Sequence, residues 1–579
     1  MATGQRLPVD VDSGGKKAKG YCTPRQLKQP QVMCVAPNRV LPIVFIPGIM
    51  GSHLRMNKAR QEKLKKSDNI AWRPDDTGAC LELKDATPAQ RQAQLDPEAT
   101  EVDDYDPKLN PTGNPGETAD ARNKQITNFA TLYLGRADSL LLIDDPVTTP
   151  NRRTKVQKAL ERGWGEVYYS SYGVLLRLCE KNFNDPFGDD GNPAGWWRRT
   201  ILDVPPAKWG AYAQPPLQPL TAEEFKQIMR GCWYPVHAMG YNWLRSNRES
   251  GKYIADRVRA LIQSYRAKGF KCEKVILVTH SMGGLVARAA VHPEMGGLNE
   301  VLGIVHGVMP AIGAGAGYKR IRCGFEGDTD SILRKVLGQK GPDVTCVLAN
   351  AQGGLELLPS QTYGNGWLQV QHHGTTLFQL PAKGDPYEEI YKVQGKWYQL
   401  LNELWINPGG LDGYGMRNTL RLLDKAKTFH QTLAGFYHPV SYAHYGVDTT
   451  RRAWKKVVWD LDTHVNSSEI AGLALSDDNA EGQLRLTSPV KKGALAAGVP
   501  VLAVQSQAGL PIGATLLPAA DPGDQTVPLS SAEDQLHSGK FRGIFRQIGY
   551  EHQASYKDEN ALYSTVYSIV RIAQTMKWS

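Results

Sequence analysis

The stretch Val275-Ile-Leu-Val-Thr-His-Ser-Met-Gly-Gly284 decides the fold of this chain. Its opening residues form an apolar, β-branched run that is typical of a buried parallel strand. Ser281 and two glycines follow, and Leu285, Val286 and Ala289 then recur at helical spacing. A strand, a tight turn that carries a serine, and a helix predict a nucleophile elbow, which exposes a serine hydroxyl for attack on an ester or amide carbonyl.

The elbow departs from the G-x-S-x-G pattern at its first position, where Thr279 replaces glycine. Glycine leaves room for the sharp turn, so a β-branched residue weakens the match. A serine in such a turn is also compatible with a purely structural elbow. The rest of the chain decides between the two interpretations.

The length and composition of the chain limit the architectures that it can adopt. Single α/β domains rarely exceed about 250–300 residues, so a chain of 579 residues must carry large insertions or a second domain. Its 41% hydrophobic and 22% charged residues and its mean hydropathy of −0.40 are ordinary for a globular protein.

The net charge of +10 is compatible with a role in solubility or in approach to an anionic membrane. Each basic residue near such a membrane contributes about 1 kcal/mol to the binding free energy. We expect no nucleic-acid partner, because basic-aromatic repeats, zinc-ligand spacings and helix-turn-helix patterns are missing.

The sequence carries no obvious targeting segment. No window reaches the run of about 18 apolar residues that a membrane span needs. The stretch from Met1 to Lys19 is polar and lacks the apolar centre of a signal peptide. We therefore expect synthesis in the cytoplasm without export by the general route.

The eight cysteines show no C-x-x-C spacing and are expected to be mostly buried thiols.

The order of the expected elements indicates a parallel sheet. Arg39 to Gly48 is an apolar strand that runs into a glycine-rich turn, and Tyr253 to Tyr265 has helical periodicity just before the elbow strand. Strand, helix, strand, turn and helix in this order form a crossover connection. We predict an α/β fold with a mostly parallel core sheet and large cap or lid insertions. Its expected parts are a flexible leader (1–37), a core (38–56, 231–310 and 439–579, with a β-rich excursion at 450–516), a first cap insertion (57–230) and a second cap or lid insertion (311–438).

A serine needs a histidine base that a carboxylate orients, and in folds of this kind the chain order is serine, acid, histidine. Downstream of the elbow, the outstanding acidic turn is Pro522-Gly-Asp-Gln-Thr-Val-Pro528. Asp524 follows a strand region there, and we expect it to be the acid. Asp521 is its competitor and is equally compatible with a turn-forming role.

The base is expected shortly before the last helix. His552 lies between the last predicted strand and the C-terminal helix, which makes it the candidate base. His537 is nearer to the acidic turn but falls within a polar, helical stretch. His280, next to the nucleophile, is expected to point away from the substrate and to be structural.

A tetrahedral intermediate needs two N–H donors for its oxyanion, and removing one such donor costs about 3–4 kcal/mol. The residue after the nucleophile, Met282, supplies one donor. We expect the other from Ile49, in the turn Pro47-Gly-Ile-Met-Gly51 after the first core strand. An ordinary strand-helix connection is the alternative for that turn. This chemistry needs no metal or organic cofactor, and a bound calcium ion is left open.

Three motifs together resemble the lipase branch of the α/β-hydrolases: Phe45-Ile-Pro-Gly-Ile-Met-Gly-Ser52, Thr279-His-Ser-Met-Gly-Gly284 and Gly523-Asp-Gln-Thr-Val-Pro528. That branch includes GPI inositol-deacylase-like and lecithin:cholesterol acyltransferase-like proteins. Leu357-Leu-Pro-Ser360 is similar to an element of the acyltransferase-like group. The resemblance implies a serine lipase with the triad Ser281, Asp524 and His552.

Among bacterial members, the size and the large insertions are similar to the lipase effectors of type VI secretion, particularly their fourth family. This resemblance implies an antibacterial enzyme that cleaves acyl esters of membrane phospholipids, often at the A1 position. It also implies a cognate immunity protein, a component of the secretion apparatus as a partner, and action in the periplasm of the target cell. The missing signal peptide fits loading from the cytoplasm.

Two alternatives stay open at this stage. The same triad would serve an acyltransferase, a neutral-lipid hydrolase or a small-ester esterase. A hydrolase fold that is kept as a binding module, with vestigial chemistry, is the other alternative. The presence of all the catalytic elements together argues against it.

Overall fold

The computed structural model describes residues 37–104, 139, 141–150, 152–188, 190–213, 215–328, 330–488 and 511–579. Its centre is a six-stranded sheet in which every pair of neighbouring strands is parallel. In spatial order the strands are β19 (Phe541–Gln547), β12 (Ser441–Gly446), β9 (Val301–Gly307), β8 (Val275–His280), β2 (Ile43–Ile46) and β7 (Val236–Ala238). The predicted α/β class with a parallel core sheet is confirmed.

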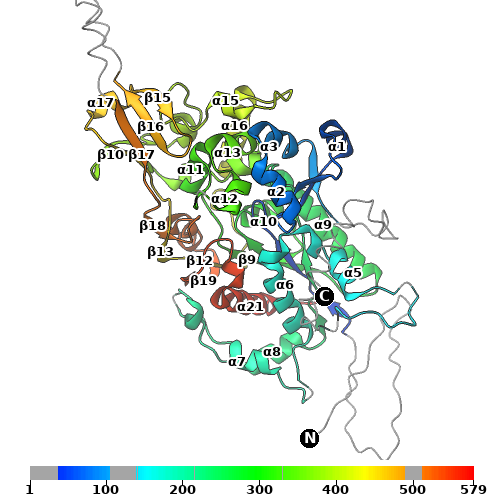
Figure 1. The fold of residues 1–579 in the computed structure, drawn as a ribbon. Helices are drawn as coiled ribbons and strands as arrows, with labels where there is room; N and C mark the ends of the chain where they lie inside the picture. Colours follow the sequence, from blue (N-terminus) through cyan, green and yellow to red (C-terminus); the bar gives the residue numbers. More distant parts are fainter. Residues whose placement is uncertain are drawn as a thin grey trace, which may run out of the picture.

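Helices cover both faces of this sheet, which explains why its strands are apolar along their whole length. Val44 and Leu277 point into one core layer with α9 (Asn247–Ala267) and α10 (Gly283–Val291). Their chain neighbours Phe45 and Val278 point into the opposite layer. That layer holds α21 (Glu559–Ala573) and α6 (Tyr169–Asn184), as can be followed in Figure 1. Because successive side chains of a strand point to opposite faces, one β-branched run fills both layers.

The first predicted insertion contributes to this core. Its helix α6 packs its buried face, including Tyr172 and Leu176, into the same layer as α21. A small sheet in the order β4-β3-β5 lies beside the turn that follows β2. The other elements of this part are β3 (Leu54–Met56), α1 (Lys58–Leu64), β4 (Ile70–Trp72), α2 (Thr77–Asp85), α3 (Pro88–Gln94), β5 (Thr100–Val102), α5 (Lys155–Glu161), α7 (Gly195–Thr200) and α8 (Ala222–Met229).

A second six-stranded sheet joins two segments that are far apart in the sequence. Its order is β11 (Thr375–Leu380), β10 (Leu368–His372), β14 (Val457–Leu461), β17 (Ile512–Leu516), β16 (Gln483–Thr487) and β15 (Ala474–Asp478). The predicted β-rich excursion therefore pairs with the second insertion through β10 and β14. The helices of that insertion are α11 (Gly315–Cys323), α12 (Ile332–Leu337), α13 (Gly341–Leu348), α14 (Gln352–Leu355), α15 (Glu403–Ile406) and α16 (Met416–Leu433). In Figure 1, α11 and α12 lie between this sheet and the core sheet.

Some predicted segments lie outside the described residues, namely 1–36 of the leader and 489–510 of the excursion. None of the helices that the structure describes is both long and apolar enough to cross a bilayer. Within the described ranges, the six cysteines form no disulfide.

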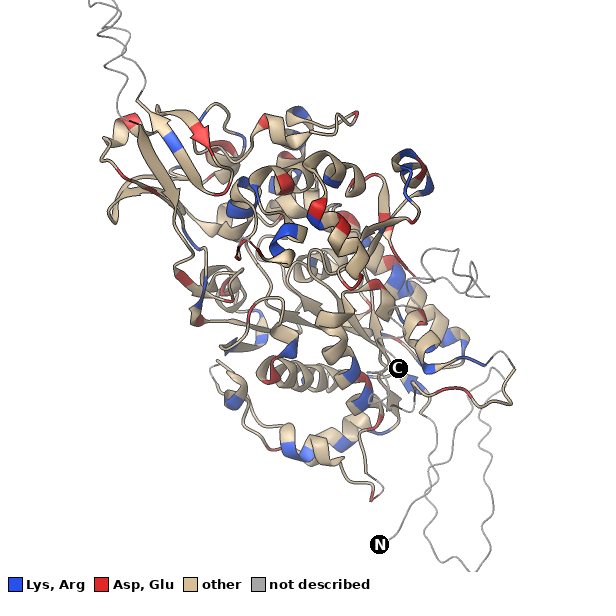
Figure 2. Ribbon diagram, viewed as in Figure 1, with Lys and Arg blue, Asp and Glu red and all other residues tan. Residues whose placement is uncertain are grey.

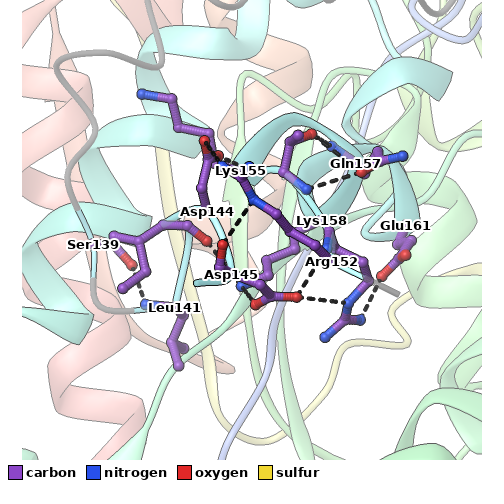
Figure 3. A network of polar contacts seen from close by, with 12 residues as sticks. Ser139, Leu141, Asp144, Asp145, Arg152, Lys155, Gln157, Lys158 and Glu161 are labelled. Atoms are coloured by element: carbon purple, nitrogen blue, oxygen red, sulfur yellow. Dashed lines mark hydrogen bonds and ion pairs between the residues drawn. The ribbon is translucent and has the colours of Figure 1, made fainter. Parts of the chain in front are cut away.

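The charges of the chain are spread over its surface and do not form one basic domain. Figure 2 shows positions of Lys and Arg interspersed with those of Asp and Glu along most elements. One such network holds the segment before α5. Lys158 pairs with Asp145 at 2.5 Å, as Figure 3 shows, and Arg153 pairs with Glu161 at 3.0 Å. Ion pairs at a protein surface each contribute about 0–1 kcal/mol, so we expect this partly buried network to position the segment more than it stabilises the fold.

A buried acid lies where the second insertion meets the core. Glu356 is fully buried, and its carboxyl group accepts the Asn247 N–H at the start of α9 (2.8 Å) and the Gln352 amide (2.9 Å). Burial raises the pKa of Glu356 to about 8. In the unfolded chain the pKa of a glutamate is about 4.3, so the folded protein holds a proton that the unfolded chain loses as the pH rises. The stability that this proton contributes is complete below about pH 4 and is lost as the pH rises toward 8.

We therefore expect Glu356→Gln, which mimics the neutral acid, to raise the melting temperature at pH 8 by about 2–4 °C. At pH 5, where Glu356 is already protonated, the gain should shrink toward zero. Thermal unfolding at both pH values checks this, with the exposed Glu403→Gln of α15 as the control, because Glu403 is not among the groups that shift the pKa of Glu356. An equal effect at the two pH values would contradict the assignment.

Candidate active site

Ser281 lies at the sharp turn between β8 and α10, in the position expected of an elbow. Its φ of +53° is a left-handed conformation that a non-glycine residue adopts only when its surroundings enforce it. A Cβ at Gly283 would lie 2.4 Å from the Pro47 carbonyl oxygen, so a glycine two residues after Ser281 is a steric requirement. Thr279 is fully buried, and its carbonyl accepts the Tyr556 hydroxyl at 2.8 Å. The turn therefore accommodates threonine at the position where the motif has glycine.

The structure brings together the three residues that the chain order predicts. His552 Nε2 lies 2.7 Å from Ser281 Oγ, and His552 Nδ1 lies 2.8 Å from Asp524 Oδ2. The three come from the elbow, from the loop after β18 (Asp521–Gly523) and from the loop between β19 and α21. Ser281 is 5% exposed, His552 8% and Asp524 1%. A nucleophile, a base and an orienting acid in this arrangement can activate a serine hydroxyl.

The carboxylate is fixed by its own loop. Asp524 Oδ1 accepts the N–H groups of Thr526 (3.1 Å) and Val527 (2.7 Å), which leaves Oδ2 for His552. The loop follows a short strand that pairs with β13 (Asp448–Ala453). Arg320 of α11 donates to Thr526 Oγ1 at 3.0 Å, so the second insertion braces the acid loop.

The two competing residues lie outside this arrangement. Asp521 accepts the Lys456 N–H at 3.2 Å and makes no contact with His552. His537 is exposed on α20 (Asp534–His537). Of the sequence candidates, Asp524 and His552 are the pair that the structure places within hydrogen-bond distance of each other.

Of the two expected oxyanion donors, Met282 directly follows Ser281, and Ile49 follows Gly48, where an added Cβ would lie 2.8 Å from the Ser281 Cβ. In the part of the chain that the structure describes, the N–H groups of Ile49 and Met282 donate to no protein atom. The turn that carries Ile49 closes through the Gly51 N–H to the Gly48 carbonyl at 3.0 Å, and Trp72 Nε1 donates to the Met50 carbonyl at 2.7 Å. Two available N–H groups beside a nucleophile are what a developing oxyanion requires.

Sequence reasoning missed two residues that surround this centre, Tyr172 and Gln553. Tyr172 comes from α6, and its hydroxyl lies 3.1 Å from His280 Nδ1 and 3.3 Å from Gln553 Nε2. No local motif marks Tyr172, which stands in a segment without recognisable pattern.

No group of three or more His, Cys, Asp or Glu side chains among the described residues is arranged to hold a metal ion.

Comparisons with known proteins place this geometry in a family. A model of the PGAP1-like alpha/beta domain matches residues 244–310, which include α9, the elbow and β9. No curated protein sequence matches the chain significantly. A solved structure, the crystal structure of the Tle4–Tli4 complex, contains a chain with 30% sequence identity and a TM-score of 0.69. The match covers 93% of this chain and 99% of that chain.

The chain belongs to the Tle4 family. Tle4 proteins are the fourth family of type VI lipase effectors, so the resemblance to this family and to the GPI inositol-deacylase-like branch is confirmed. As a Tle4 protein the chain is an α/β-hydrolase of the lipase and esterase type and an effector of type VI secretion. The match extends over nearly the whole Tle4 chain and therefore includes the insertions as well as the core.

Proposed function

We propose that this chain is a serine phospholipase in which Ser281 is the nucleophile, His552 the general base and Asp524 the orienting acid. One observation carries the proposal. His552 lies within hydrogen-bond distance of both Ser281 Oγ (2.7 Å) and Asp524 Oδ2 (2.8 Å), at the elbow of a lipase-type fold.

The geometry supports the following reaction. His552 Nε2 takes the Ser281 proton as Oγ attacks the acyl carbonyl, and Asp524 stabilises the imidazolium that forms. The N–H groups of Ile49 and Met282 hold the oxyanion of the tetrahedral intermediate. His552 then gives its proton to the departing lysolipid oxygen, and water, activated by the same histidine, releases the fatty acid from the acyl-enzyme. The reaction uses no cofactor.

Membership in the Tle4 family supports a phospholipid as the substrate. Cleavage at the A1 position is our further proposal. The nearly complete burial of Ser281 supports the proposed acyl-transfer chemistry but does not distinguish between ester substrates, because a dry site strengthens oxyanion stabilisation for any of them. A transferase or an esterase for small or neutral esters would use the same three residues. Those alternatives differ in the acceptor and in the size of the acyl site, not in the triad.

The structure of the relative is a complex of Tle4 with Tli4, and we propose that this chain likewise binds a cognate immunity protein. We also propose that a component of the type VI apparatus carries it and that it acts in the periplasm of the target cell. Expression directed to the periplasm of a test bacterium should arrest growth, and expression in the cytoplasm should not. Ser281→Ala should be harmless in both compartments.

The substrate proposal is tested with vesicles of phosphatidylethanolamine and phosphatidylglycerol that carry distinguishable acyl chains at sn-1 and sn-2. We expect fatty acid from the sn-1 position and a 2-acyl lysophospholipid, with no release by Ser281→Ala. Release of the sn-2 chain would overturn the A1 assignment. Hydrolysis of short soluble esters without release from vesicles would overturn the phospholipid assignment and leave an esterase.

A further inference from the structure

His280, next to the nucleophile, is held between two elements of the site. It is 1% exposed, and its Nε2 lies 2.9 Å from the His552 carbonyl oxygen. Its Nδ1 lies 3.1 Å from the Tyr172 hydroxyl. The loop between β19 and α21, which carries His552, is thus in direct contact with His280, the residue before Ser281. The Asp524 carbonyl accepts the His552 N–H at 2.9 Å, so the backbone of the base is fixed on both sides.

The chemistry of these partners sets the direction of each hydrogen bond. A carbonyl oxygen only accepts, so His280 must carry its proton on Nε2 and donate to His552. Nδ1 is then an acceptor, and the Tyr172 hydroxyl donates to it. Burial holds the pKa of His280 well below its usual range and raises the pKa of Tyr172 to about 12. Both groups therefore stay neutral, and this single arrangement of protons persists at physiological pH.

The same tyrosine hydroxyl lies under the turn that carries the proposed oxyanion donor. It accepts the Gly48 N–H at 3.5 Å and the Gln553 amide at 3.3 Å. A Cβ at Gly51 would lie 2.7 Å from the Tyr172 oxygen, so the hydroxyl fills the space beneath the turn.

The start of α6 is anchored as well, which fixes Tyr172 in turn. Asp75 accepts the N–H of Tyr169 at 2.7 Å and that of Ser170 at 3.1 Å. Asp75 is itself paired with the buried His53 at 3.2 Å. A helix that belongs to the first insertion is thereby locked against the oxyanion turn.

We propose that Tyr172 and His280 are positioning residues. Their hydrogen bonds hold the oxyanion turn, Ser281 and His552 in fixed positions relative to one another. Tyr172 contacts the turn at Gly48 and, through His280, the backbone of His552. The first insertion, which contains α6, thus influences catalysis through a series of hydrogen bonds that starts at Tyr172. This inference rests on the proposed role of Ser281 and His552.

The first test is Tyr172→Phe in the full-length protein, with a soluble p-nitrophenyl ester as the substrate. We expect kcat to fall about tenfold with KM within about twofold, because misplacement of reacting groups affects the chemical step. The rate of Ser281 acylation by a fluorophosphonate should fall by a similar factor. Tyr169→Phe is the matched control: it removes a buried hydroxyl from the same helix, one that Arg177 contacts at 3.2 Å, and should leave kcat unchanged.

A pair of His280 variants separates positioning from general packing. The amide nitrogen of His280→Gln can occupy the Nε2 position and still donate to the His552 carbonyl, whereas His280→Ala cannot. We expect His280→Ala to lose about 100-fold in kcat and His280→Gln to recover most of that loss. Tyr172→Phe should cost less in the His280→Gln background than in the wild type, because residues that act through one another are not additive.

Three outcomes would overturn the inference: equal effects of Tyr172→Phe and Tyr169→Phe, equal losses for the two His280 variants, or effects of Tyr172 and His280 that multiply independently. Thermal unfolding of each variant identifies losses caused by misfolding. The kcat and the labelling rate, each expressed per folded protein, then decide between the outcomes. Failure of the proposed function gives a different result, since the wild type would then neither hydrolyse the ester nor be labelled.

Discussion

Replacing Ser281 by alanine is expected to lower kcat for ester hydrolysis by about 10⁴–10⁶-fold, which is the size of effect found when a triad nucleophile is removed. The hydroxyl is the atom that attacks, and His552 at 2.7 Å is its proton acceptor. Without it, the covalent route is closed. A small residual rate should remain, because the oxyanion donors and the binding site persist.

Initial rates with a soluble ester and with phospholipid vesicles measure this loss. The matched control is Ser530→Ala, since Ser530 is half-buried near the acid loop and its hydroxyl has no hydrogen-bond partner among the described residues. We expect the control to keep wild-type activity. A Ser281→Ala protein that retains more than about a tenth of the wild-type kcat would show that another group attacks the ester.

Asp524→Asn should lower kcat by about 10⁴-fold while the fold stays intact. The asparagine oxygen can still accept the N–H groups of Thr526 and Val527, so its amide nitrogen would face His552 Nδ1. An N–H donor in that position forces His552 into the tautomer that carries its proton on Nε2. That tautomer cannot accept the Ser281 proton.

The matched control for this change is Asp521→Asn, which alters the competing acid of the same loop. Among the described residues, the Asp521 side chain accepts the Lys456 N–H and has no hydrogen bond to His552, and we expect activity within about twofold of wild type. The comparison uses steady-state rates together with thermal unfolding of both variants. If Asp521→Asn inactivates the protein and Asp524→Asn does not, the acid has been assigned to the wrong residue.

The core and the candidate site could be predicted because their signals are local. The strand at 275–280 is a continuous apolar run, and the turns at Ser281 and Asp524 carry glycine and proline at positions where the backbone bends sharply. The order serine, acid, histidine then restricted the base to the end of the chain. The structure brings these residues together, and the assignment of their catalytic roles stays a prediction.

Features that depend on distant pairings could not be predicted. The second sheet needs β10 to pair with β14, and no periodicity within either strand encodes that choice of partner. Tyr172 is 108 residues from His280 in sequence, within a segment that has no motif. His280 was expected to be structural, and its link to the His552 carbonyl depends on a loop at the far end of the chain.

The central claim is that Ser281 is an activated nucleophile, and covalent labelling tests it most directly. The full-length protein is incubated with a fluorophosphonate, its intact mass is measured, and the modified peptide is sequenced. We predict one adduct per chain, on Ser281, with labelling strongly slowed in His552→Ala and abolished in Ser281→Ala. No adduct on the folded wild-type protein, or an adduct on a different residue, would contradict the account.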